Sequence, residues 1–160
     1  MKKIVLLLII TAISGISFSP PHPPMTYSPV FMSRDALESS VKYIAGARDM
    51  VQTGKIYYRA PYIYVNERYK GVHVINNSNP AQPVNEGFIL APGCIDMAVK
   101  GHILYLDNSV DLVSFDLDKK QVTKRIRNAL PEPLPPDDFN YYWVSRPEGY
   151  VLVEWKKIIP

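Results

Sequence analysis

Hydrophobic and polar residues alternate with a period close to two through the middle of the chain, from residue 54 to residue 128. Runs of β-branched and aromatic residues are separated by turns rich in Gly, Pro, Asn and Asp, a pattern typical of antiparallel strands. The pattern predicts eight strands, which are Lys55–Ala60, Tyr62–Asn66, Val72–Asn76, Val84–Leu90, Ile95–Lys100, Ile103–Asp107, Leu112–Asp116 and Gln121–Ile126.

These eight strands divide into two copies of a four-stranded unit. Tyr62–Asn66 matches Ile103–Asp107 at an offset of 41 residues, and Val72–Asn76 matches Leu112–Asp116 at an offset of 40. A four-stranded unit that recurs at this spacing is typical of a β-propeller blade. We therefore predict a mainly β fold with two consecutive four-stranded antiparallel propeller-like blades, stacked face to face.

One helix is predicted before the strands, over Ser33–Ala45. Its first residue is a serine that can cap the helix, and Leu37, Val41 and Ile44 recur at i, i+4 and i+7 to form one apolar face. Gly46 can adopt the left-handed conformation that ends a helix. Because the apolar stripe is narrow, we expect a surface helix that lies on a larger body.

The N-terminal segment, residues 1–19, has the order of a secretory signal peptide. Met1–Lys3 is short and positive, Ile4–Ile13 is almost wholly apolar, and small residues follow. Cleavage is expected near Ser17 or Ser19. The apolar stretch is shorter than the roughly 20 residues of a membrane-spanning helix, so the alternative is an uncleaved signal anchor. The sequence predicts no transmembrane span in the mature chain.

Two proline-rich segments separate the remaining predicted parts of the chain. The sequence predicts a proline-rich, extended tether over 20–31, a helical lead-in over 32–53, the two blades over 54–128, a second proline-rich linker over 129–139 and a C-terminal β hairpin over 140–160. The hairpin would pair Tyr141–Val144 with Tyr150–Trp155. Together with the helix, it completes the predicted fold.

Composition and charge narrow the function classes. Hydrophobic residues make up 47% and charged residues 21% of the chain, which is typical of a globular protein. The formal net charge is +3, and Lys2 and Lys3 of the predicted signal peptide contribute two of these charges. The remainder is too small to favour nucleic acid as a partner. The only basic cluster, Lys124–Arg127, is interpreted as a solvated strand end.

The sequence contains no known catalytic motif. It lacks a nucleophile elbow, a phosphate loop, a dinucleotide fingerprint and a zinc-binding helix. His22, His73 and His102 are too scattered for a zinc set, and His73 is expected to be a hydrogen-bonded core or interface residue. Cys94 is the single cysteine, so an intrachain disulfide is impossible and a buried thiol is favoured over a reactive one near His102. We predict no catalytic residue, no metal site and no cofactor.

Two weaker chemical hypotheses remain. Asp107 with Asp111, or Asp116 with Asp118, offer carboxylate oxygens to calcium, although neither pair has the loop pattern of a calcium site. Aromatic residues are frequent in the strands and in the tail, and binding of carbohydrate or peptide by an exposed subset is the alternative to ordinary strand packing. These aromatic residues are Tyr57, Tyr58, Tyr62, Tyr64, Tyr69, Tyr105, Tyr141, Tyr142, Trp143 and Trp155.

The strand motifs resemble those of the LVIVD-repeat family of extracytoplasmic bacterial β-propeller proteins. Val72–Asn76 and Leu112–Asp116 correspond to the five residues that give the family its name, and Asn79–Pro83 matches the Asn-Pro-x-x-Pro turn that follows. The second copy departs from that turn at Asp118–Gln121. Met32–Glu38 is similar to the helical lead-in of longer members. Further departures within the two motifs are His73, Asn76 and Ser114.

The resemblance covers roughly residues 54–127 and implies a short or truncated member of a repeat scaffold on the cell exterior, with no catalytic residue to transfer. It favours a non-enzymatic exported binding or structural module with an unknown protein or glycan partner. The alternatives are an extracytoplasmic propeller-type enzyme, a calcium- or carbohydrate-binding protein, and a fragment of a longer propeller. Two blades leave open sheet edges, which favour self-association.

The signal-peptide interpretation predicts a processed product. When the chain is produced in a secreting bacterium, mass spectrometry of the purified protein should give an N-terminus close to Ser17 or Ser19. A product that keeps Met1 and Ile4–Ile13 and stays with the membranes would instead support the signal anchor.

Overall fold

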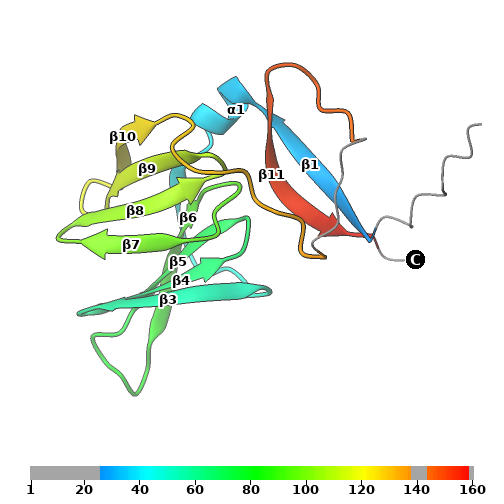
Figure 1. Ribbon diagram of the computed structural model, residues 1–160. Helices are drawn as coiled ribbons and strands as arrows, with labels where there is room; N and C mark the ends of the chain where they lie inside the picture. Colours follow the sequence, from blue (N-terminus) through cyan, green and yellow to red (C-terminus); the bar gives the residue numbers. More distant parts are fainter. Residues whose placement is uncertain (1–25, 138–143, 159–160) are drawn as a thin grey trace, which may run out of the picture.

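The structure, a computed structural model, describes residues 26–137 and 144–158. This part of the chain contains a five-stranded sheet, a four-stranded sheet, a two-stranded ribbon and one short helix (Figure 1). The elements are β1 (Tyr27–Ser33), α1 (Arg34–Glu38), β2 (Lys42–Ala45), β3 (Thr53–Arg59), β4 (Tyr62–Glu67), β5 (Gly71–Asn76), β6 (Val84–Leu90), β7 (Met97–Lys100), β8 (Ile103–Asn108), β9 (Asp111–Asp116), β10 (Gln121–Ile126) and β11 (Tyr150–Lys157). The prediction of a mainly β, antiparallel fold is confirmed.

The eight strands predicted for the middle of the chain are present as β3 to β10. Strands β6 and β10 have the predicted bounds, β3 differs at both ends, and each of the others differs by one or two residues at one end. β3 to β6 form one antiparallel meander and β7 to β10 form another, while β2 is added at the outer edge of β6. Short loops join consecutive strands, so the turn residues of the sequence locate nearly every strand boundary.

The two meanders pair in the same register. Tyr64 of β4 lies opposite Val74 of β5, and Tyr105 of β8 lies opposite Ser114 of β9. The first two strands correspond at an offset of 41 residues, the third at 40 and the fourth at 37. In both meanders the pairing of the third and fourth strands shifts at the corresponding bulge. The segments matched in the sequence therefore occupy equivalent places in their sheets.

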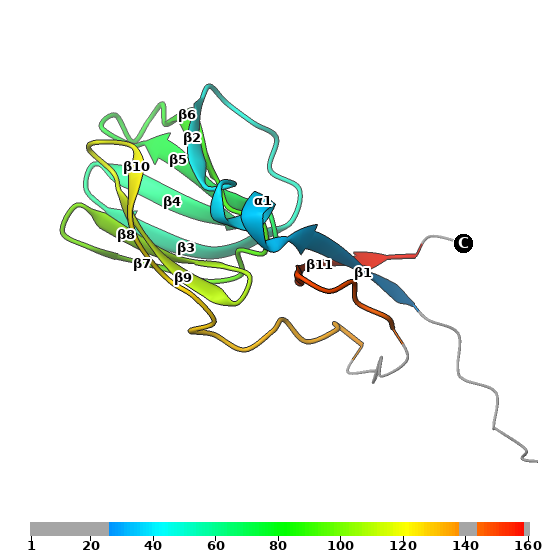
Figure 2. The ribbon, with the colours of Figure 1, turned by 90° about the horizontal axis from the view of Figure 1, so that it is seen from above.

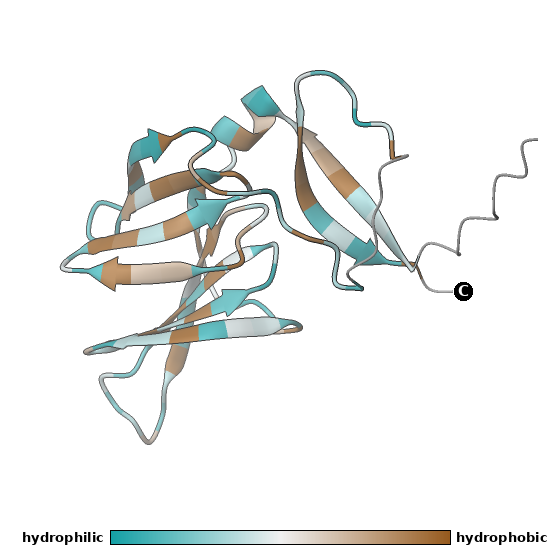
Figure 3. Cartoon of the chain, in the orientation of Figure 1, coloured by the Kyte–Doolittle hydropathy of each residue, from teal (hydrophilic) through white to brown (hydrophobic). Residues whose placement is uncertain are grey.

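One core lies between the two sheets, which stack face to face (Figures 1 and 2). Hydrophobic residues alternate with paler ones along β8 (Figure 3), and its Leu104 and Leu106 point into this core. Each buried aliphatic side chain contributes about 1.5–3 kcal/mol of transfer free energy, so this contact is the main stabilising one. The buried residues are Tyr64, Val72, Val74, Ile89, Ala91, Cys94, Met97, Val99, Leu104, Leu106, Val113 and Phe115.

The predicted helix over Ser33–Ala45 is wrong in extent, because only α1 (Arg34–Glu38) is helical. Its start is correct: the Ser33 hydroxyl accepts a hydrogen bond from the Ala36 N–H at 3.3 Å. Its end comes early because the Ser39 and Ser40 hydroxyls donate to carbonyls of the helix. Such side-chain bonds compete with continued helical turns.

The remainder of that segment is strand β2, which pairs with the edge of β6. Ile44 lies opposite Phe88, and Tyr43 lies opposite Ile89. The aromatic and β-branched residues of Lys42–Ala45 favour an extended chain, and the free edge of β6 supplies backbone partners that a surface helix would not gain. Gly46, with a φ of 96°, follows a strand and not a helix.

The predicted tether over 20–31 is wrong for residues 27–31, whereas the predicted hairpin over 140–160 stays a prediction, because most of its first strand lies outside the described residues. Tyr27–Ser33 is strand β1 and pairs antiparallel with β11, from Tyr27 opposite Lys157 to Ser33 opposite Tyr150. Residues 20–25 and 141–143 lie outside the described residues. Within the described chain, β11 therefore forms a ribbon with the beginning of the chain. The period of two in β11 predicted a strand correctly, but a local pattern cannot specify a distant partner.

The β1–β11 ribbon packs against the end of the two sheets (Figure 2). Val151 and Val153 join Leu37 and Val110 in one apolar cluster, and Met32 packs against it. A second cluster consists of Tyr69, Leu152 and Trp155. The Lys70 Nζ lies 2.5 Å from the Glu154 carboxylate, and the Trp155 Nε1 donates to the Pro133 carbonyl at 2.8 Å.

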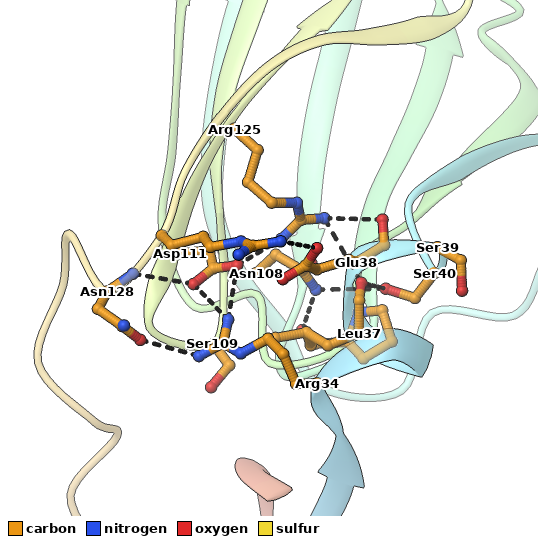
Figure 4. A network of polar contacts seen from close by, with 12 residues as sticks. Arg34, Leu37, Glu38, Ser39, Ser40, Asn108, Ser109, Asp111, Arg125 and Asn128 are labelled. Carbon is orange, nitrogen blue, oxygen red and sulfur yellow. Dashed lines mark hydrogen bonds and ion pairs between the residues drawn. The ribbon is translucent and has the colours of Figure 1, made fainter. Parts of the chain in front are cut away.

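A buried carboxylate ties α1 to the second sheet. Asp111, at the start of β9, accepts two hydrogen bonds from the Arg34 guanidinium at 2.8 and 2.9 Å, one from Arg125 at 2.8 Å and one from the Asn128 N–H at 3.0 Å (Figure 4). The second Arg125 nitrogen donates to the carbonyls of Leu37 and Glu38. Burial alone would raise the pKa of Asp111, but these donors hold it below the usual value.

Loss of the Asp111 charge should destabilise the fold. Asp111→Asn leaves two guanidinium groups with one neutral partner, so we expect the free energy of unfolding to fall by about 3 kcal/mol. Urea unfolding followed by circular dichroism measures it. The matched control is Asp49→Asn in an exposed loop, expected to lie within about 0.5 kcal/mol of the parent. An equally small effect for Asp111→Asn would show that the network contributes little.

Acidification should also destabilise the fold. Burial opposes ionisation of Glu67, but the N–H groups of Gln52 and Val51, at 2.5 and 3.1 Å, and nearby His73 lower its pKa. The pKa values of Asp96, Asp111 and Asp116 are lowered as well, whereas burial raises that of Asp107. Most of these carboxyl groups have lowered pKa values. Their ionised forms therefore stabilise the fold above a pH of about 4, and this stabilisation is lost below it.

Urea unfolding at several pH values tests this linkage. The midpoint should fall as the pH drops from neutrality through the range of ordinary carboxyl groups, because the unfolded chain takes up protons first. Glu67→Gln removes one titrating group and should flatten the dependence. A midpoint that is constant down to a pH of about 3 would contradict the assignment.

Candidate functional site

A cleft of about 240 Å³ opens between the two sheets at one end of their stack. Tyr43 comes from β2, Tyr62 and Tyr64 from β4, and Glu86 from β6, while the turn between β9 and β10 supplies the opposite wall. The residues that line it are Tyr43, Arg59, Tyr62, Tyr64, Val74, Glu86, Ile89, Phe115, Leu117, Asp118 and Lys120. Concave sites with aromatic walls and a few convergent polar groups are typical of ligand pockets.

Tyr43 is placed by strand β2 and by the glycine beside it. A Cβ atom at Gly87 would lie 2.1 Å from the Tyr43 hydroxyl oxygen, so the ring packs over the bare backbone of β6. The Tyr43 hydroxyl donates to the Glu86 carbonyl at 3.2 Å. The Lys120 ammonium lies 4.1 Å from the centre of the same ring, which is the geometry of a cation–π contact.

Lys120 lies in the turn between β9 and β10, and hydrogen bonds to the Asp116 side chain hold this turn. The Asp116 carboxylate accepts hydrogen bonds from the N–H groups of Lys119 and Asp118, at 2.9 and 3.0 Å. The backbone donors lower the pKa of Asp116 and fix the turn after β9. Lys120 itself has a φ of 55°, in the left-handed region, which directs its side chain back toward the first sheet.

Tyr62 and Tyr64 form the floor of the cleft. Their ring centres are 6.3 Å apart and their planes are tilted by 36°. Burial raises the pKa of Tyr62, and the Glu86 carboxylate raises it further. Burial also raises the pKa of Tyr64, while Arg59 opposes that increase. Both phenols are therefore neutral at physiological pH, when each offers one hydrogen-bond donor and one acceptor.

The charged groups of the cleft balance. Arg59 and Lys120 are cationic, and Glu86 and Asp118 are anionic. The Asn76 amide donates to the Glu86 carboxylate at 3.3 Å, which orients that group at the rim. A site with aromatic walls, neutral phenols and charged groups that balance suits a neutral ligand that has many hydroxyl groups.

The acids considered for calcium are engaged with the protein itself. Asp111 is paired with arginines, Asp116 holds its turn, and Asp107 accepts the N–H groups of Asp96 and Ile95 at 2.7 and 3.1 Å. Asp118 alone of the four lines the cleft. Among the described residues, no group of three or more acidic, histidine or cysteine side chains is arranged to hold a metal ion.

The lone cysteine and two of the histidines lie away from the cleft. Cys94 is fully buried, its Sγ accepts a hydrogen bond from the Asn66 amide at 3.3 Å, and burial raises its pKa well above the usual value. His102 faces Asp116 at 3.9 Å. His73 is fully buried, with its Nε2 3.3 Å from the Glu67 carboxylate, as expected for a core histidine. His22 lies outside the described residues.

The residues of the basic cluster and the aromatic residues differ in their exposure and in their partners. In the basic cluster, Arg125 is paired with Asp111, Arg127 lies 2.6 Å from Glu38, and Lys124 is exposed. Of the aromatic residues, Tyr64, Tyr69 and Trp155 are buried, Tyr57, Tyr62 and Tyr105 are half-buried, and Tyr58 is exposed. Tyr141, Tyr142 and Trp143 lie outside the described residues.

Sequence analysis missed several residues of the cleft. It placed Tyr43 inside a helix, and it gave no role to Arg59, Glu86 or Lys120. One signal was present: an aromatic residue beside β-branched Ile44 favours a strand. No local signal relates Tyr43 to Lys120, because these residues meet only when the two sheets stack.

Comparison with known proteins adds no relative. No protein-family model, no curated protein and no solved structure matches this chain.

Proposed function

We propose that this protein is a non-enzymatic exported β-repeat protein of the LVIVD-repeat type, which binds a neutral carbohydrate in the cleft between its two sheets. The observation that carries the proposal is the convergence of Tyr43, Tyr62 and Tyr64 with two cations and two anions at that cleft. In this proposal each meander is one propeller-like blade.

The identical register of the meanders supports the repeat assignment. Tyr64 and Tyr105 hold the same place, as do Val72 and Leu112 of the two family-like motifs. The matched bulges in the fourth strands extend the likeness beyond the strands noted in the sequence. The β3–β4 pair has one further shift, between Thr53 and Ile56, in the part of β3 that precedes the residues equivalent to β7. Two unrelated meanders would not be expected to share the register of the remaining pairs and a bulge at the same place in the fourth strand.

The export part of the proposal rests on residues 1–19, which lie outside the described residues. Their charged start, apolar centre and small-residue end are those of a signal peptide, so the proposed location is extracytoplasmic. In residues 26–137 and 144–158, no helix is long and apolar enough to span a bilayer.

The ligand class follows from the walls of the cleft. Sugar rings stack their C–H faces on aromatic rings and use their hydroxyl groups as both donors and acceptors. Tyr62 offers a ring and a hydroxyl, while Glu86 and Arg59 offer an acceptor and a donor. The cleft of about 240 Å³ is small for a ligand pocket, so the proposed ligand occupies it with a single sugar unit. The balanced charge makes a strongly acidic or basic ligand a poorer fit.

The engagement of Asp107 and Asp111 removes from the cleft the two acids that the sequence offered for an enzyme. The carboxyl groups of the cleft itself are Glu86, which accepts the Asn76 amide, and Asp118. A glycoside hydrolase needs two free carboxyl groups that face each other across the substrate. Asp107 and Asp111, the acids suggested for an enzyme, are held by backbone amides and arginines away from the cleft.

Titration of the ¹⁵N-labelled protein with neutral mono- and disaccharides tests the function. Glucose, galactose, N-acetylglucosamine and their β-linked dimers are the probes, and amide shifts should concentrate around Tyr43, Tyr62 and Lys120 for at least one. Tyr62→Ala should weaken that binding by about tenfold or more, since it removes a ring and a hydroxyl.

Tyr150→Ala is the matched control, because this tyrosine is 43% exposed on β11, away from the cleft. It should leave the saccharide affinity unchanged. Absence of shifts at the cleft with every sugar would contradict the carbohydrate assignment. A rise in melting temperature with Ca²⁺ that is reversed by EDTA would support the calcium alternative instead.

A further inference from the structure

Each sheet has two faces, and the stack uses only one face of each. We call the face that carries Tyr64 in the first sheet and Tyr105 in the second the front face, and the opposite one the back face. The core between the sheets joins the front face of the first sheet, with Tyr64 and Val74, to the back face of the second, with Met97 and Val99. In the part of the chain that the structure describes, no sheet lies against the back face of the first sheet or the front face of the second.

The free back face of the first sheet carries large exposed apolar side chains. Ile56 and Tyr58 of β3 are 65% and 62% exposed. By register they correspond to Met97 and Val99, which are 3% and 8% exposed in the core between the sheets. Ile63 and Ile75 continue the row from Tyr58 across the sheet and are half-buried.

The free front face of the second sheet is the counterpart. Ile126 is 46% exposed and corresponds to Ile89, which is completely buried in the core. Tyr105 is half-buried, whereas its equivalent Tyr64 is 2% exposed. Ala98, Ile103 and Leu112 lie on this face as well, together with the charged Lys100 and Lys124.

The segment before β3 covers part of the back face of the first sheet, where the Arg48 guanidinium lies 5.0 Å from the centre of the Phe88 ring. Its residues Val51 and Gln52 are held on the first sheet by Glu67, which accepts their N–H groups. At the register-equivalent place before β7, the amide of Asn108, the counterpart of Glu67, donates to the Pro92 carbonyl at 2.6 Å, and the neighbouring Ala91 and Cys94 belong to the core between the sheets. The packing of the two sheets within the chain therefore already accommodates a segment of this kind, held by the residue that corresponds to Glu67.

We infer that the two free faces form a head-to-tail interface between copies of this chain. The back face of the first sheet in one copy packs on the front face of the second sheet in the next, and so continues the internal contact across two molecules. The occupant is a second copy because the two surfaces are the complementary halves of a contact that the chain makes within itself. A heterologous contact closes into a ring when the rotation between copies allows it, and a ring of two copies would bring four meanders together, the smallest number of blades in a propeller.

This inference goes beyond the proposed carbohydrate site, and it differs from pairing through open strand edges. Edge pairing would use backbone groups of strands such as β10 or β11. The head-to-tail interface uses side chains on two faces at opposite ends of the stack, and each copy contributes a different face to each contact.

Two charge substitutions at opposite ends test the interface. The full chain, produced in a secreting host and purified after processing, is examined by sedimentation velocity over about a hundredfold range of concentration. The parent should form a dimer or a larger closed ring. Tyr58→Glu blocks the back face and Ala98→Glu blocks the front face, so each alone should lose most of the ring.

Mixing the two variants gives the decisive result. Tyr58→Glu keeps an intact front face and Ala98→Glu keeps an intact back face, so together they should form a one-to-one pair. Ile56→Glu and Ile126→Glu provide a second pair of substitutions should either first variant fail to give the melting curve of a folded protein. Leu134→Glu, at a residue 77% exposed in the linker after β10, is the control and should leave the ring intact.

Three outcomes overturn the inference. A parent that is monomeric at every concentration has no such interface. Assembly that resists both Tyr58→Glu and Ala98→Glu uses another surface, such as the strand edges. Assembly lost in only one variant and not restored by mixing indicates a symmetric contact between like faces. Carbohydrate binding at the cleft is measured separately, so its failure and that of the interface are distinguishable.

Discussion

The packing of one sheet face on another is the constraint from which the rest of this structure follows. Each meander carries apolar side chains on both faces, and a sheet of this kind is stable only when those faces leave water. Within the chain, the front of the first sheet covers the back of the second, and one core results. The two remaining faces carry the exposed Ile56, Tyr58 and Ile126, which is the physical basis for the inferred contact between copies.

The ends of the chain are attached to this stack by a different kind of interaction. Ribbon β1–β11 brings together residues near the two ends of the described chain, and its apolar side chains cover one end of the sheets. The buried Asp111 then joins α1 to β9 and β10 through Arg34 and Arg125. A carboxylate that is removed from water requires such donors, so these contacts specify one arrangement of α1 against the second sheet.

The cleft is a consequence of the same stacking. At the cleft, side chains of the two sheets are no longer completely covered, and tyrosines and charged residues of both signs join the aliphatic ones. Gly87 leaves room for the Tyr43 ring, and the turn held by Asp116 returns Lys120 to that ring. The proposed sugar would therefore lie at the rim of the main core, on rigid strands and a bonded turn.

The sequence by itself determined the eight central strands, because alternation and turn residues are local properties of the chain. It also located the offsets of 41 and 40 residues that the register of both sheets follows. It did not determine the fate of Val41 and Ile44: their spacing suits a helix, and only the free edge of β6 selects a strand. The partner of β11 and the meeting of Tyr43 with Lys120 were decided by tertiary structure, since both join segments that are far apart in the chain. Contacts of that range depend on which faces and edges are left to be covered once the local elements have formed.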